Sequence, residues 1–192
     1  MKKVLIKVMV LSILVAVTAT VSAQSSNVAG IYKTENDYVN HKLSYSYGGS
    51  TTGSIRVNDF FSSPTIVVKV DGKKYSLLKS EIFGYQASNG KSYRFNNGIA
   101  YEIVDTAGFY FYTTFAYEQA KSSTRVLKYF FSANATDAPR QLTKEQLDNV
   151  FAANTKFRYS VAAQFTNDNA LVGYDSFLHC YKLKYLFTES LK

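Results

Sequence analysis

Residues 99–117 read IAYEIVDTAGFYFYTTFAY, and this stretch decides the fold. From Phe109 onward the residue types alternate between two faces. One face would carry Phe109, Phe111, Phe115 and Tyr117, and the other Tyr110, Tyr112 and Thr114. Alternation with a period of two, in a run rich in aromatic residues, predicts β-strands. Ala107-Gly108 predicts a turn, so the segments on either side of it form neighbouring antiparallel strands.

Further turn signals occur on both sides of this stretch. Asp71-Gly72 separates two strand-like runs, and Asp-Gly in that position is a strong hairpin signal. Asn89-Gly90 and Asn97-Gly98 predict two more turns of the same kind. The strands that these turns connect are Thr65–Val70, Lys73–Leu78, Phe83–Ala87, Ser92–Phe95, Ile99–Asp105, Phe109–Tyr117 and, after a polar loop, Arg125–Ser132. The short connections predict an antiparallel meander of about six to eight strands, either open or curved toward a barrel.

Helix signals lie before and after these strands. Thr34 followed by Asp37 predicts a capped short helix, and Thr143 followed by Gln146 predicts the cap of another. The second of these helices is expected to extend to about Ala153. Another helix is predicted over residues 156–164.

The last predicted helix starts near Asn167. It would carry one apolar stripe at helical spacing, formed by Leu171, Tyr174, Phe177, Leu178, Tyr181 and Tyr185. A sheet followed by helices predicts an α+β fold with the C-terminal helices packed on the sheet. We expect a single domain over residues 24–192, with the short helix and the sheet in 24–135 and the helical part in 140–190.

The N-terminus has the three regions of a secretory signal peptide. Met1-Lys2-Lys3 is basic, an apolar run follows over residues 8–17, and Val21-Ser22-Ala23 matches a small-residue cleavage site. The alternative is a retained membrane anchor, but a span takes about 20 mostly apolar residues and Lys7 limits the uncharged run. We expect residues 1–23 to be removed and the product to be periplasmic or extracellular. Because the only thiol is Cys180, we do not expect a lipoprotein.

The composition excludes several classes of protein. Apolar residues make up 46% of the 192 residues, which is enough to build a core and argues against disorder. One Cys and two His exclude a disulfide framework within the chain, and we expect neither a metal nor a cofactor. Without the signal residues, 19 basic residues stand against 14 acidic ones, so the net charge falls from +8 to +5. This modest charge, without a recognition motif, does not indicate nucleic-acid binding.

Several segments of the mature chain are similar to a group of small, uncharacterised exported proteins of Gram-negative bacteria. The similar segments are Asp37–Leu43, Asn58–Phe61, Gly72–Tyr75, Ile82–Tyr85, Lys91–Phe95, Tyr101–Ile103 and Tyr174–Phe177. The resemblance covers most of the mature chain and implies a shared fold. No activity or functional residue is assigned in that group, so the resemblance implies no mechanism.

Catalytic motifs are mostly absent from the sequence. There is no G-x-S-x-G elbow, no P-loop and no H-E-x-x-H. His179-Cys180 is not expected to form a catalytic dyad, because adjacent residues on a helix point about 100° apart. We interpret Cys180 as a packed small residue and His41 as a surface residue, with no catalytic residue assigned.

One candidate binding surface remains. Tyr110 and Tyr112 share a strand face, and Lys128 lies on a face of the following strand, so together they would form a platform for sugars, peptides or flat ligands. The alternative is that the C-terminal helices cover this face, or that the hydroxyls reach water at its rim. The leading hypothesis is a non-catalytic exported protein that binds a ligand or an envelope partner through a sheet face or loops. The other hypothesis is a small secreted hydrolase, which would require two carboxylates about 5–10 Å apart in a deep cleft.

Overall fold

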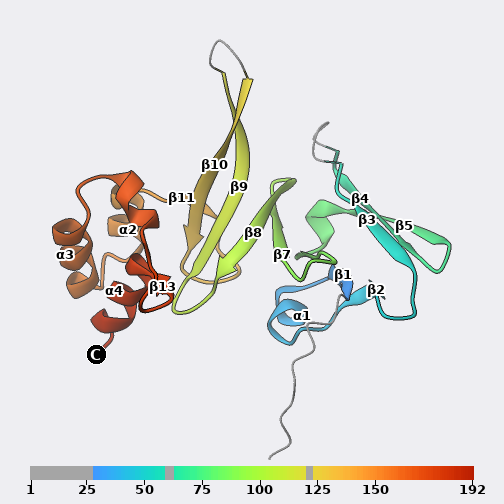
Figure 1. Ribbon diagram of the computed structural model, residues 1–192, viewed down its shortest axis with the longest axis horizontal. Coiled ribbons are helices and arrows are strands. Elements are labelled where there is room, and N and C mark those ends of the chain that lie inside the picture. The colour runs from blue at the N-terminus through green and yellow to red at the C-terminus, as the bar shows by residue number, and fades with distance from the viewer. Residues whose placement is uncertain (1–27, 59–62, 120–122) are drawn as a thin grey trace, which may run out of the picture.

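The computed structural model describes residues 28–58, 63–119 and 123–192 (Figure 1). The predicted signal peptide therefore lies outside the described residues. The fold is α+β, as predicted, with an eight-stranded antiparallel sheet at its centre. The C-terminal helices lie at one end of this sheet and a separate three-stranded sheet lies at the other (Figure 1). The large sheet is open and does not close into a barrel.

The strands of the described residues form three sheets. In spatial order, the large sheet consists of β11 (Arg140–Gln141), β10 (Ser123–Ser132), β9 (Tyr110–Gln119), β8 (Ile99–Asp105), β7 (Ser92–Asn96), β6 (Gly84–Gln86), β1 (Ala29–Tyr32) and β2 (Ser44–Tyr47). The three-stranded sheet consists of β3 (Gly53–Arg56), β4 (Thr65–Val70) and β5 (Lys73–Leu78). A third, two-stranded sheet pairs β12 (Tyr174–Asp175) with β13 (Cys180–Tyr181).

The helices are short. They are α1 (Glu35–Val39), α2 (Lys144–Val150), α3 (Thr155–Gln164) and α4 (Lys182–Ser190), with 3₁₀ turns at Lys79–Glu81 and Asp168–Val172. The predicted N-terminal cap of α1 is confirmed. Thr34 Oγ1 accepts a hydrogen bond from the Asp37 amide, and the Asp37 carboxylate accepts one from the Thr34 amide, both at 3.1 Å. At α2, Thr143 Oγ1 accepts from the Gln146 amide at 3.1 Å, and the helix ends at Val150, before the expected Ala153.

The predicted hairpins are confirmed, although the one at Asn89-Gly90 has a longer loop, closed between Ala87 and Lys91, in which only Gly90 has a positive φ. Asp71 and Gly72 have φ angles of 47° and 78° and join β4 to β5. Asn97 and Gly98 have φ angles of 50° and 76° and join β7 to β8. Two-residue turns require positive φ at both positions, and these dipeptides tolerate it. Strands β6 to β10 consequently follow one another as the predicted meander.

Two features of the sheets differ from the prediction. The strand β1 extends the meander by pairing with β6 on one side and β2 on the other. All four of its residues are buried, so its sequence has no alternation that would indicate a strand. Strands β4 and β5 belong to the separate sheet, where Ile66 and Val68 are fully buried against the large one.

The predicted terminal helix is wrong in its first half. The 3₁₀ turn at Asp168–Val172 is followed by the β12–β13 hairpin, and α4 begins only at Lys182. The carboxylate of Asp175 accepts from the amides of Phe177 and Leu178 at 2.9 and 3.0 Å, which closes a turn in place of a helix. Of the six residues predicted to form the stripe, only Leu171 is fully buried, and Phe177 is 90% exposed.

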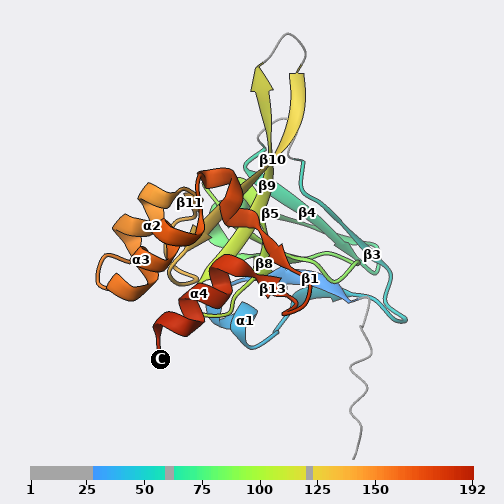
Figure 2. The same cartoon turned by 60° about the vertical axis from the view of Figure 1, so that its left-hand side comes forward.

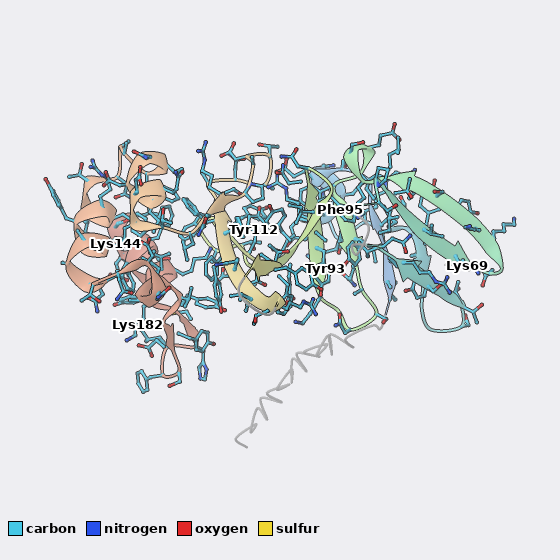
Figure 3. All side chains as sticks on the ribbon, turned by 90° about the horizontal axis from the view of Figure 1, so that it is seen from above. Lys69, Tyr93, Phe95, Tyr112, Lys144 and Lys182 are labelled. Atoms are coloured by element: carbon cyan, nitrogen blue, oxygen red, sulfur yellow. The ribbon has the colours of Figure 1, made fainter. Side chains whose placement is uncertain are left out.

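Two hydrophobic cores lie on one face of the large sheet. The helical core packs side chains of α2, α3 and α4 against Phe109, which precedes β9, and against Phe111 of β9 and Phe131 of β10. The sheet core packs the three-stranded sheet against side chains of β1, β6 and β7, including Ile31 and Tyr85. Figure 3 shows the two ends, with Lys144 among the helices and Lys69 in the small sheet, and with Tyr93 and Tyr112 between them.

Candidate functional site

The predicted platform residues lie on the face of β9 and β10 that is turned away from the C-terminal helices. Tyr112 is fully buried, whereas Tyr110 and Lys128 are half-buried. The helical core occupies the opposite face. The C-terminal helices therefore do not cover the platform, contrary to the alternative considered from the sequence. The elements over Tyr112 and Tyr110 are α1 and the loop over residues 133–139, as the following contacts show.

The guanidinium of Arg94 is the centre of this face. Arg94 on β7 is buried and donates to the hydroxyl of Tyr112 at 3.0 Å. It also donates to the carbonyl oxygens of Asp137 at 2.7 Å and Thr136 at 3.2 Å, which ties the 133–139 loop to the sheet. The Tyr112 hydroxyl also shares a hydrogen bond of 2.9 Å with Ser132 Oγ. This network satisfies a buried cation through neutral groups and aromatic rings.

Tyrosine rings surround the Arg94 network. Tyr38 of α1 stacks on Phe83 at 5.3 Å and lies 6.4 Å from the ring of Tyr110. Burial, with smaller effects from Tyr110 and its neighbours, raises the pKa of Tyr38 to about 12. Burial likewise raises the pKa of Tyr112 and Tyr110. These hydroxyls therefore stay protonated at neutral pH, and ligand binding by Tyr110, Tyr112 and Lys128 stays a prediction.

The outer half of the β9–β10 hairpin projects beyond the rest of the molecule. We call residues 114–117 of β9 and 124–128 of β10 the hairpin arm, and it rises above the other elements in both Figure 1 and Figure 2. On the helix side of the arm, Phe115 is 51% exposed, Tyr117 63% and Leu127 39%. The Arg125 guanidinium lies 3.8 Å from the centre of the Phe115 ring. The arm thus presents apolar side chains and a cation to solvent.

The arm extends past the ends of the strand pairing on either side of it. Strand β8 pairs with β9 only from Phe111 to Thr113, and β11 pairs with β10 only at Phe130 and Phe131. Within the described ranges, no third strand pairs with the arm itself. Backbone amides and carbonyls along such an edge can accept an additional strand.

The sequence suggested the composition of the arm but not its exposure. Phe115 and Tyr117 alternate in phase with the buried Phe109 and Phe111, so the pattern alone predicts a continuous buried face. The helical core ends before it reaches them. The signal that identifies the arm is the length of its strands, since ten residues of β9 or β10 extend about 33 Å, whereas a helix of ten residues such as α3 extends only about 15 Å.

The remaining candidate groups do not converge. Cys180 is half-buried in β13, whereas His41 and His179 are exposed. Across residues 28–58, 63–119 and 123–192, no three metal-ligating side chains gather in a way that could hold an ion.

A cavity of about 270 Å³ lies between α2 and α3. Its lining includes Leu147, Phe157, Asp148 and Arg158. The carboxylate of Asp148 is hydrogen-bonded to Arg158, and this contact lowers the pKa of that carboxyl. Lys144, also in the lining, donates to the carbonyl oxygen of Phe165 at 2.7 Å. The charged groups named here are thus engaged with other protein groups, and we assign this cavity no function.

Two further findings concern membrane-spanning helices and similarity to known proteins. In the described part of the chain, none of the helices has the length and apolar character needed to cross a bilayer. No family model, curated protein or solved structure matches the chain. The residues themselves therefore carry the functional argument.

Proposed function

We propose that this chain is an exported, non-catalytic binding protein that engages a protein partner in the cell envelope through its hairpin arm. The observation that carries the proposal is the exposure of Phe115, Tyr117 and Leu127 on a two-stranded ribbon that projects beyond the helices. The N-terminal sequence supports export, and the absence of recognisable nucleophile motifs from the sequence supports binding over catalysis.

The chemistry of the arm suits a protein partner. Aromatic residues and Arg are enriched where protein surfaces meet, because a large rigid ring buries much area at little cost in side-chain entropy. Arg125 lies on Phe115 and so holds a cation beside an apolar surface. A partner strand that paired with either edge would gain main-chain hydrogen bonds in addition to these side-chain contacts.

Site-specific photo-crosslinking in cells tests the proposal. A photoreactive phenylalanine at Tyr117 should capture one discrete envelope protein of different sequence. The matched control position is Tyr159 of α3, which is 73% exposed and lies on a helix away from the arm. We expect capture from Tyr117 to be lost when Leu127→Ser is added, and Tyr159 to give no such product.

Two results would contradict the proposal. One is the same pattern of products from both positions, which would show that exposure alone determines capture. The other is a product of twice the mass of this chain, which would make the arm a contact between two copies. The second variant Phe115→Ser guards against a local effect of Leu127→Ser, and circular dichroism of both variants verifies that the sheet remains folded.

A further inference from the structure

A single row of directly paired residues crosses the large sheet from one core to the other. From β1 to β10 the row is Ile31, Tyr85, Tyr93, Glu102, Thr113 and Tyr129. Residues that face one another in adjacent antiparallel strands lie on the same side of the sheet. The six residues of the row therefore lie on the face of the sheet that carries both cores, and they cross the region between those cores.

The row is buried at Ile31 and Tyr85 and again at Thr113, which is 8% exposed, whereas Tyr93, Glu102 and Tyr129 are half-buried. Ile31 and Tyr85 lie in the sheet core, and Tyr129 packs at the margin of the helical core. Between them, Tyr93 is half-buried and the side chain of Glu102 is 25% exposed. A partly exposed carboxylate thus lies between the two cores.

The polar groups in this middle part form a neutral set. Lys91 Nζ lies 2.7 Å from Glu102 Oε1, and the Tyr93 hydroxyl donates to Glu102 Oε2 at 3.5 Å. The positive and negative charges cancel within the pair. An ionised carboxylate offers about four acceptor sites and an ammonium three donors, so both groups have capacity for a ligand.

Aromatic rings flank the pair on both sides. Tyr93 stacks on Tyr85 with ring centres 4.7 Å apart and planes at 9°. On the helical side, Tyr129 stacks on Phe111 at 5.8 Å, and Tyr181 meets the same Phe111 ring edge-on at 4.7 Å. Burial raises the pKa of Tyr181, with smaller increases from the neighbouring tyrosines and carboxylates.

We propose that Lys91, Tyr93, Glu102, Tyr129 and Tyr181, which we call the tyrosine strip, bind a neutral oligosaccharide. Half-buried tyrosines offer an apolar ring surface to the C–H faces of a sugar and keep a hydroxyl at the water boundary. The carboxylate accepts hydrogen bonds from sugar hydroxyls and the ammonium donates to their oxygens, and charge-assisted hydrogen bonds of this kind are the stronger ones. A charged ligand would meet no unbalanced charge in the Lys91–Glu102 pair, so the ligand is uncharged.

Calorimetric titration of the mature chain tests the proposal. The probes are cellotetraose, maltotetraose, mannotetraose and tetra-N-acetylchitotetraose, each up to about ten millimolar. We expect at least one of them to bind, with an affinity that does not change between low and high salt, because screening affects only unbalanced charge. Glu102→Gln should weaken that binding by about tenfold or more, the effect of a lost charge-assisted hydrogen bond. The matched control Glu145→Gln in α2, an exposed carboxylate outside the strip, should leave it unchanged.

Other outcomes would overturn the proposal. These are the absence of heat from all four probes, or equal affinities in the unmodified chain and in Glu102→Gln. If Glu102→Gln does not fold, Lys91→Met gives the same answer, because the Lys91 side chain is 53% exposed and its loss leaves the cores intact. Binding that appears only with a charged peptide, or that salt abolishes, would also refute it. Because Leu127→Ser alters the arm and not the strip, it should abolish partner capture from Tyr117 and leave sugar binding intact.

Discussion

Arg94 and Tyr112 are bound to each other inside the protein, with a donor–acceptor distance of 3.0 Å between the guanidinium and the phenol oxygen. The contact joins β7 to β9 across β8, and the same guanidinium holds the 133–139 loop through two carbonyl oxygens. One buried cation therefore links the middle of the sheet to the segment that precedes the C-terminal helices. Removal of these Arg94 contacts should therefore lower the free energy of unfolding of the whole domain.

Tyr112→Phe tests this link. The ring remains, but Arg94 loses an acceptor and Ser132 loses a partner, so we expect the free energy of unfolding to fall by about 1–3 kcal/mol in urea titrations. Tyr110→Phe is the control, because the Tyr110 hydroxyl has no hydrogen-bond partner among the described residues and should lose less than about 0.5 kcal/mol. An equal decrease in the free energy of unfolding of the two variants would show that the hydrogen bonds of the Tyr112 hydroxyl do not stabilise the fold.

Gly72→Val tests the β4–β5 turn. A side chain at Gly72 would meet no atom within 4 Å, so any loss must come from its φ of +78°. A β-branched residue tolerates that region poorly, and we expect a loss of about 1 kcal/mol or more in the free energy of unfolding. Gly72→Asn should lose less, since Asn adopts positive φ more readily. Thermal unfolding that ranks the two variants in the opposite order would refute the strain argument.

Lys184 gives the protein a pH-dependent contribution to stability. Its ammonium is buried in α4, donates to the carbonyl oxygens of Ala107 and Phe109, and lies 3.4 Å from Asp105 Oδ1. Burial lowers the pKa of Lys184 from 10.5 to about 8, against the opposing effect of Asp105. Between these values the unfolded chain keeps a proton that the folded protein has lost, so this contribution rises with pH.

The comparison with Lys184→Met isolates this effect. The free energy of unfolding of the unmodified chain minus that of the variant should increase by about 2 kcal/mol from pH 7 to pH 10. Lys182→Met, an exposed neighbour on the same helix, should show no such change. A Lys184→Met difference that stays constant with pH would mean that the ammonium titrates near its unfolded value.

The same substitution at two phenylalanines, Phe187 in α4 and Phe177 in the hairpin before it, should have very different effects on stability. Phe187 is buried and its ring contacts Phe109, Phe151 and Phe157 at 5.1–5.2 Å, so Phe187→Ala should lower the free energy of unfolding by about 3–5 kcal/mol. Phe177, at the tip of the β12–β13 hairpin, should tolerate the same change within about 0.5 kcal/mol. Urea denaturation measures both, and a large loss at Phe177 would restore the continuous stripe that the sequence predicts.

Export predicts a defined mature N-terminus. Protein recovered from a Gram-negative periplasm should have the mass of residues 24–192, because Val21-Ser22-Ala23 matches the small-residue pattern that signal peptidase cleaves. Intact-mass spectrometry checks this directly. A mature species that still contains Met1–Ala23 would contradict the prediction.

The sequence predicts the features of this fold that depend on local chemistry. The Asp71-Gly72 and Asn97-Gly98 turns and the Thr34 cap involve residues within three positions of one another, and the structure has all of them. The platform prediction placed Tyr112 correctly on its strand face, but local pattern does not show that Arg94, distant in the chain, would lie beside it. Exposure of the arm was equally hidden, because alternation reports which face a residue joins and not whether another layer reaches it. At Asp175, the side chain accepts two backbone hydrogen bonds and closes a turn where the spacing of apolar residues predicts a helix.

The position of β1 has a consequence for the order in which the chain folds. The bond from the Tyr32 hydroxyl to Gln86 closes a loop of 54 residues, at 2.7 Å between its two atoms. During synthesis β1 therefore has to wait for a partner made much later, while each strand of the β6–β10 meander pairs with a neighbour made just before it. Such long-range closure slows folding. We expect the meander to form first, and β1 and β2 to join an edge that is already in place.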